Sequence, residues 1–178
     1  MKPSGKRTHR LPAILAALML ASPATAFDLD SDTPIKVSAD SARLDDTEGT
    51  AIYTGDVELV QGATQLNAER VVLYRSPEGL SRIEASGEPA RYRQPAREGE
   101  AMTDARARTI TWSAAENRLT FERQAVIEQG NNVFRGDVIQ YDTVRRVVTA
   151  EGGTPSEESS GRVEMVIQPR GSSNPSDE

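Results

Sequence analysis

The side chains with which this sequence could do chemistry are its carboxylates. The chain has no cysteine and a single histidine, His9, which falls within an expected export signal. Without histidine or cysteine, a mature chain lacks the parts of a Ser-His-Asp or Cys-His nucleophile system, a histidine general base and the usual zinc site. Paired carboxylates, as in glycoside hydrolysis, are the remaining acid–base option. The acidic residues considered for this role are Asp45, Asp46, Glu48, Asp56, Glu58, Glu69 and Asp137.

The positions of these carboxylates argue against catalysis. Asp56 and Glu58 alternate with apolar residues, so on a strand they face water. Glu69 and Asp137 fall in expected corners of the chain, where a carboxylate can accept hydrogen bonds from backbone N–H groups. We therefore expect no catalytic residue, no metal site and no cofactor.

The first 26 residues have the three parts of a secretory signal. Four Lys and Arg residues form a basic start, residues 11–20 are apolar apart from Pro12, and residues 24–26 match an A-x-A cleavage site. The apolar run is shorter than the roughly 20 residues that span a bilayer. Cleavage after Ala26 leaves 152 residues, and we expect a soluble protein of the bacterial periplasm.

The net charge excludes one class of partner. The signal carries four basic residues and no acidic residue, so its removal changes the formal charge from −6 to −10. Nucleic-acid affinity comes mainly from Lys and Arg contacts with phosphates. We therefore expect no nucleic-acid partner.

The stretch from Thr50 to Tyr74 predicts the architecture, because its pattern returns 68 residues later. Gln61-Gly62 recurs as Gln129-Gly130, and residues 66–69 recur as 134–137. Ala51, Tyr53, Val57 and Leu59 alternate with Thr54, Asp56 and Glu58, which is the period of a strand with one face in an apolar interior and one in water. These observations predict a duplicated antiparallel β-structure.

The alternation slips at small residues elsewhere in the chain. After Ala39, Ala68, Gly87, Ala107 and Gly136, the next inward residue comes three positions later instead of two. Such a slip marks a bulge or corner where a strand turns while its apolar side stays inside. Stacking of these bent units predicts an all-β fold, an elongated folded-over antiparallel β-jelly roll with internal duplication.

The expected domain organisation is simple. A cleaved signal at 1–26 precedes one β-jelly roll over 27–170, and a disordered tail follows at 171–178. Phe27 to Thr33 is an acidic leader, and turns are expected near 47–49, 61–62, 76–79 and 129–132. Residues 94–102 form a longer loop, and a Gly/Ser/Glu loop over 151–161 precedes one last strand.

The inward apolar stripe is either ordinary core or a ligand groove. Most buried hydrophobic residues only pack. Because aromatic residues make up only 4% of the chain, the folded sheet is expected to be loosely filled and able to hold an apolar ligand. An acyl chain would gain about 0.8 kcal/mol per buried methylene. The inward positions expected to contact such a ligand are Leu44, Val57, Leu59, Leu73, Phe121 and Phe134.

The stack of bent strands has two open ends. The natural edge strands are Ile35-Lys36-Val37 at the start and the segment containing Val163, Met165 and Ile167 at the finish. The unpaired N–H and C=O groups of an edge strand can form hydrogen bonds with a strand of another chain. Pairing of the first edge with the last would build open filaments. The alternative is that loops or charges cap both ends.

The order of short motifs resembles a known family. IKVSADSARLD, YTGDVELVQG, LNAERVVL and GEPARY follow one another from Ile35 to Tyr92, and the likeness extends to Gln168. The chain is similar in these motifs to the OstA-like domain family of periplasmic lipopolysaccharide-transport proteins, the LptA family. The resemblance implies a β-jelly roll whose groove carries the acyl chains of lipid A. The positions that it implies contact lipid are Ile35, Val37, Arg75, Tyr92 and Trp112.

The same resemblance implies protein partners. It implies head-to-tail self-association and edge-strand contacts with an LptC-like protein on the inner-membrane transporter and an LptD-like protein at the outer membrane. Two alternatives remain open at this point. One is a secreted β-sandwich enzyme that acts on envelope glycans through carboxylates, and the other is a structural periplasmic β-fibre subunit with a filled core and no lipid binding.

Overall fold

The computed structural model describes residues 27, 32–96, 101–145, 147–155 and 161–167. The signal expected at 1–26 and the tail expected at 171–178 lie outside these residues. The strands of the described part are β1 (Ile35–Ser38), β2 (Ser41–Asp45), β3 (Thr50–Gln61), β4 (Thr64–Ser76), β5 (Gly79–Gln94), β6 (Thr103–Ser113), β7 (Arg118–Gln129), β8 (Asn132–Asp142), β9 (Val147–Glu151) and β10 (Glu164–Val166). No helix in this described portion is long and apolar enough to cross a membrane.

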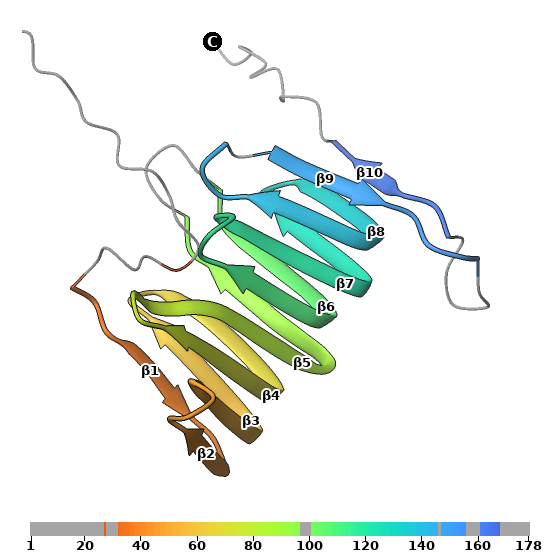
Figure 1. Ribbon diagram of the computed structural model, residues 1–178. Helices are drawn as coiled ribbons and strands as arrows, with labels where there is room; N and C mark the ends of the chain where they lie inside the picture. The colour runs from red at the N-terminus through yellow and green to blue at the C-terminus, as the bar shows by residue number, and fades with distance from the viewer. Residues whose placement is uncertain (1–26, 28–31, 97–100, 146, 156–160, 168–178) are drawn as a thin grey trace, which may run out of the picture.

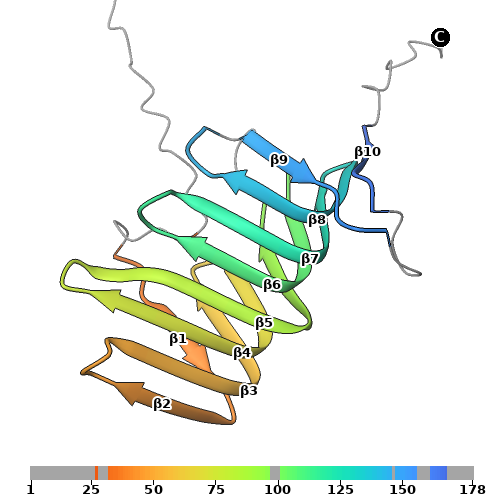
Figure 2. The same ribbon diagram turned by 45° about the vertical axis from the view of Figure 1, so that its right-hand side comes forward.

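All ten strands form one antiparallel sheet with the order β1-β3-β4-β5-β6-β7-β8-β10. β1 and β2 pair with different halves of β3, and β10 and β9 pair with different halves of β8. Each end of the sheet is therefore a bent strand made of two short pieces. Figures 1 and 2 show the long strands bent at mid-length and stacked, so that the sheet folds over on itself. The expected folded-over β-jelly roll is confirmed.

Breaks in the hydrogen-bonding register locate the bends. Neighbouring strands slip between Asn67 and Arg70, between Ser86 and Ala90, and between Arg106 and Thr109. These breaks contain the expected corners at Ala68, Gly87 and Ala107. Gly136 lies at the break between β7 and β8, and Ala39 separates β1 from β2, so all five expected corners are confirmed.

The strand expected over residues 51–59 is confirmed as part of β3, and two further bends lie where the alternation shows no slip. β3 bends at Gly55 and Asp56, with φ of 83° and 41°, and β7 bends at Arg123 and Gln124, with φ of 63° and 57°. In each bend the step between the flanking inward residues is four, from Tyr53 to Val57 and from Phe121 to Ala125, so the inward phase of the apolar residues continues unchanged. The alternation therefore carries no sign of these corners, and Asp56 lies in one of them.

Left-handed backbone positions confirm the internal duplication. Positive φ at Gly49, Gly55, Asp56 and Gly62 recurs 68 residues later at Asn117, Arg123, Gln124 and Gly130. A backbone hydrogen bond recurs at the same interval: Arg75 N–H donates to the Gly49 carbonyl at 2.8 Å, and Thr143 N–H donates to the Asn117 carbonyl at 2.9 Å. β3 and β4 are thus the counterparts of β7 and β8.

The core lies between the two halves of the folded sheet. Inward residues such as Leu59, Leu66, Ile83 and Ile139 are fully buried within a single apolar cluster. At the last bend the backbones come close, because a Cβ added at Gly136 would lie 2.9 Å from the carbonyl oxygen of Glu151. A small residue is needed there, as the expected corner chemistry requires.

Candidate functional site

An apolar cavity of about 950 Å³ opens between the two halves of the sheet at the β1–β2 end. This volume is near the upper end of the roughly 300–1,000 Å³ of ordinary ligand pockets. The cavity exists because the folded sheet ends there, so inward side chains of β3 and β4 have only the short β1 and β2 to cover them. Its apolar lining consists of Ile35, Val37, Leu44, Ala51, Tyr53, Leu73 and Leu80.

Charged and polar groups from two turns form the rim of this cavity. The Arg75 guanidinium donates to the Asp46 carboxylate at 2.7 Å, and side-chain exposures of 47% and 89% leave both groups in water. Such an exposed pair contributes little to stability, so Arg75 remains able to exchange its partner for another anion. In the other turn the Ser76 hydroxyl donates to Glu78 at 2.7 Å. That hydrogen bond, together with one from a backbone N–H, lowers the pKa of the Glu78 carboxyl.

Aromatic rings fill the middle of the interior. Phe27 is 2% exposed and packs edge-on against Tyr92 and Trp112, with ring centroids 6.1 and 5.8 Å away. Tyr92 in turn packs edge-on against Phe121 at 6.3 Å, and its hydroxyl donates to the side chain of Gln94 at 3.2 Å. None of these four rings lines the cavity; three of them belong to β5, β6 and β7, farther along the stack from the β1–β2 end.

The residues expected to contact an acyl chain divide between these two regions. The cavity is lined by Ile35, Val37, Leu44, Leu73 and Arg75. The packed interior contains Val57, Leu59, Tyr92, Trp112 and Phe121, each at most 3% exposed, with Phe134 partly buried beside them.

Sequence reasoning missed Phe27, Ala51, Tyr53 and Leu80 as site residues. The alternation of β3 places Ala51 and Tyr53 on the inward face, so the signal for them was present. Phe27 stands alone in the acidic leader, and no periodic pattern could have placed it inside.

The terminal strands occupy the ends of the sheet, where the edge interface was expected. Among the residues that the structure describes, β1, which contains Ile35, Lys36 and Val37, pairs with β3 alone, and β10 pairs with β8 alone. In β10 and directly beside it the hydrophobic side chains are exposed: Val163 is 40% exposed, Met165 51% and Ile167 66%. Whether another chain pairs with these edges stays a prediction.

Comparison with known proteins connects this architecture to one family. Residues 36–147 match the family model described as LptA/(LptD N-terminal domain) LPS transport protein. The lipopolysaccharide export system protein LptH of Pseudomonas aeruginosa is 39% identical over 167 residues, covering 91% of this chain and 95% of LptH. The lipopolysaccharide export system protein LptA of Escherichia coli K12 is 30% identical over 135 residues, covering 74% of this chain and 72% of LptA.

A solved structure agrees with the sequence comparisons. The crystal structure of LptH, described as the LptA-homologous periplasmic component of the lipopolysaccharide transport device of Pseudomonas aeruginosa, superimposes with a TM-score of 0.69 and 40% identity. The superposition covers 77% of this chain and 96% of LptH. With a family match across the sheet and relatives aligned over most of their length, the chain belongs to the family of LptA and LptD amino-terminal-domain lipopolysaccharide-transport proteins.

Proposed function

We propose that the protein carries lipopolysaccharide through the periplasm by holding the acyl chains of lipid A between the two halves of its folded sheet. The observation that supports this most directly is the cavity of about 950 Å³, which combines an apolar lining with a charged rim. An amphiphile fits such a site, because its chains enter the interior while its polar part stays at the rim. The names of the relatives point to the same cargo.

The chemistry of the lining makes binding broad rather than stereospecific. Ile35, Val37, Leu44 and Leu73 offer burial and dispersion to a hydrocarbon chain, at about 0.8 kcal/mol per methylene. At the rim, Arg75 is the cation available to a phosphate of the head group, since its present partner Asp46 is highly exposed. The protein performs no bond-making step in this proposal, so energy for transfer comes from a partner.

The packed interior is the proposed continuation of the acyl-chain path. Chains reach Val57, Leu59, Tyr92, Trp112, Phe121 and Phe134 when the Phe27 ring leaves its place among the central aromatic residues. The same packing supports the second candidate function, a structural β-fibre subunit whose interior is simply a filled core. The two functions differ in whether lipid enters at all.

The terminal strands are the proposed contacts for a bridge. Addition of a strand to β1/β2 at one end and to β9/β10 at the other would extend the sheet in both directions. We propose head-to-tail self-association and contacts with LptC-like and LptD-like proteins through these edges, so that one continuous groove connects the two membranes.

Photo-crosslinking in living cells tests the groove. A photoreactive residue at Val37 or Leu73, both on the cavity wall, is expected to form adducts with lipopolysaccharide. Lys36 is the matched control, because it neighbours Val37 and is exposed on the opposite face of β1. Adducts at Lys36 equal to those at Val37, or no adducts at any position from an exported and folded protein, would contradict the carrier function. The second outcome would favour the fibre subunit.

A further inference from the structure

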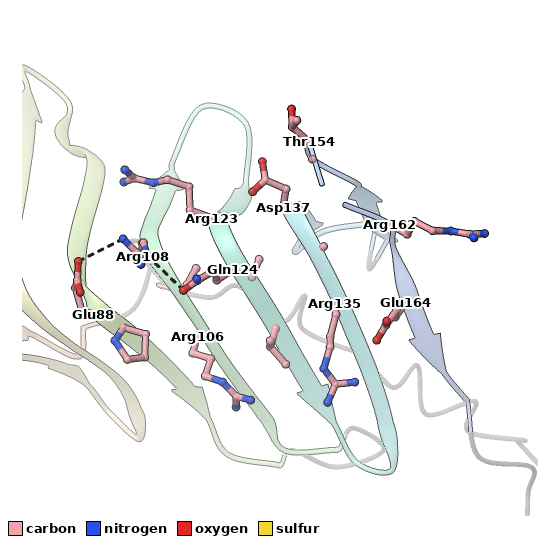
Figure 3. Close-up of a pocket in the computed structure, with 16 residues that line it drawn as sticks. Glu88, Arg106, Arg108, Arg123, Gln124, Arg135, Asp137, Thr154, Arg162 and Glu164 are labelled. Atoms are coloured by element: carbon pink, nitrogen blue, oxygen red, sulfur yellow. Dashed lines mark hydrogen bonds and ion pairs between the residues drawn. The ribbon is translucent and has the colours of Figure 1, made fainter. Parts of the chain in front are cut away.

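A second cleft, of about 670 Å³, lies on the outer side of the sheet, at the bends of β6, β7 and β8. Ala107 and Ala125 of these bends are 1% exposed and face the interior, so the adjacent side chains of Arg106 and Val126 point outward. The cleft is therefore separated from the apolar cavity by the sheet itself. Figure 3 shows the side chains that line it.

The lining of this cleft is basic although the whole chain is acidic. Five arginines and three carboxylates contribute to it, in a chain of formal charge −6. These charged residues are Arg106, Arg108, Arg123, Arg135, Arg162, Glu88, Asp137 and Glu164. A local excess of positive charge on an acidic protein concentrates anions at that point of the surface.

The register of the strands places arginines directly opposite one another. Arg91 of β5 is paired with Arg106 of β6, and Arg106 is separated from Arg135 of β8 only by Val126 of β7. Like charges in such cross-strand positions destabilise a sheet. Within the described residues neither Arg91 nor Arg135 forms an ion pair, although Glu164 of β10 lies directly opposite Arg135. An anion bound between Arg106 and Arg135, the two of these arginines that line the cleft, would lower the repulsion further.

Neighbouring groups hold two of the arginines in place. The Arg106 guanidinium donates to Glu128 at 3.2 Å, and Arg108 donates to Glu88 and to Gln124, each at 3.4 Å. Figure 3 shows Arg108 between these two partners, and Arg106 and Arg135 extending in the same direction on either side of β7. The guanidinium groups of Arg106 and Arg135 thus lie on either side of Val126, and each can donate N–H hydrogen bonds to a ligand placed between them.

We infer that this cleft binds a phosphorylated saccharide. The planar guanidinium groups of Arg106 and Arg135 match the oxygens of a phosphate, which arginine recognises through paired hydrogen bonds. The carboxylates of Asp137 and Glu164 and the hydroxyl of Thr154, also in the lining, suit sugar hydroxyls as hydrogen-bond acceptors. Inorganic phosphate would repel these carboxylates and leave most of the volume unfilled. The inference does not depend on acyl-chain binding, because the two sites lie on opposite faces of the sheet.

Titration of the isotope-labelled mature protein, followed by NMR, tests this inference. Glucose 1-phosphate is expected to shift backbone amide signals around residues 106–108, 123–126 and 135–137. Inorganic phosphate is expected to bind at least tenfold more weakly at the same amides, and glucose should cause no shift there. Raising the salt concentration should weaken binding of the sugar phosphate, as expected for a charged ligand.

Charge-matched variants locate the binding residues. Replacing both Arg106 and Arg135 by Gln is expected to weaken glucose 1-phosphate binding at least tenfold. The control replaces both Arg82 and Arg118 by Gln and so removes the same charge. These two arginines lie on either side of Ser113 and outside the cleft, and they pair with Glu84 at 2.8 Å and Glu116 at 3.4 Å. This control should bind as the unaltered protein does, and each variant's amide spectrum reports whether it is folded.

Three results would overturn the inference. Absence of shifts in the cleft amides with glucose 1-phosphate would exclude the site. Inorganic phosphate binding as tightly as the sugar phosphate would exclude the saccharide part. An equal loss of affinity in the control with Arg82→Gln and Arg118→Gln would show that only net charge matters. None of these outcomes affects the crosslinking test of the apolar cavity, so failure of one site is distinguishable from failure of the other.

Discussion

Phe27 occupies the interior through which acyl chains are proposed to pass, so its replacement by alanine tests the carrier function directly. Burial of a phenylalanine contributes up to about 3 kcal/mol, and the edge-to-face contacts with Tyr92 and Trp112 add about 0.5 kcal/mol each at their weakest. Fixing the backbone and side chain of one residue costs about 2 kcal/mol. The docked ring is therefore stabilised by a net free energy of about 2 kcal/mol.

This value sets the expected effect on binding. A net 2 kcal/mol leaves the ring undocked in about one molecule in thirty, and a ligand that needs the ring undocked loses the same factor in apparent affinity. Phe27→Ala is thus expected to bind lipopolysaccharide roughly thirtyfold more tightly. It should also lower the free energy of unfolding by about 2 kcal/mol, less than the roughly 3–5 kcal/mol lost when a phenylalanine is removed from a closed core.

Trp112 provides the assay, because it is the only tryptophan in the sequence and its ring lies 5.8 Å from that of Phe27. Titration of the mature protein with lipopolysaccharide, followed by tryptophan fluorescence, gives the affinity, and urea denaturation gives the stability. Phe27→Leu is the matched control, since it retains an apolar side chain and should stay close to the unaltered protein. Phe27→Ala that binds no more tightly and loses more than about 3 kcal/mol of stability would show Phe27 to be ordinary core.

The remaining predictions concern the bends and the rim. Gly55→Ala is expected to lower the free energy of unfolding by more than about 2 kcal/mol, because Gly55 has φ of 83° and an added Cβ would lie 2.8 Å from Asp40 Cβ. Gly62→Ala, with φ of 59° and its nearest neighbour at 3.8 Å, should cost only about 1–2 kcal/mol in the same urea denaturation; equal losses would contradict the steric explanation. Ser76→Ala is expected to raise the pKa of Glu78 toward its ordinary value, since the Ser76 hydrogen bond is the main cause of its lowering. An NMR titration that finds this pKa unchanged would assign the effect to the backbone N–H.

The fold was predictable because burial leaves a periodic record in the sequence. At Ala68 and Gly136 the next inward residue comes three positions later instead of two. This step changes which positions face inward and so indicates a bend. At the bends of residues 55–56 and 123–124 the next inward residue comes four positions later, which leaves the phase intact. These two bends are visible only in the backbone conformation. Gly55 is a residue type that favours a left-handed backbone, but Arg123 and Gln124 are not.

The site was predictable only in part, because alternation tells which residues face inward and not whether the interior is full. Leu44 and Leu59 both satisfy the inward pattern, yet Leu44 is 62% exposed and Leu59 is completely buried. The difference arises from position along the stack: Leu59 has neighbours on both sides, and Leu44 lies on the terminal β2. Phe27 was missed because an isolated residue shows no periodic pattern. The outer arginine cleft was missed because its residues come from five strands and one connecting segment.

The 68-residue duplication has a consequence for how such a protein can change its length in evolution. In the described part of the chain, each long strand is hydrogen-bonded only to its immediate neighbours along the sheet. One repeat can therefore be copied in frame without disturbing contacts elsewhere. The interval from β3 to β7 spans four strand spacings, or about 19 Å along the stack. A gene duplication of this unit would lengthen the span and the enclosed interior together, in one step of fixed size.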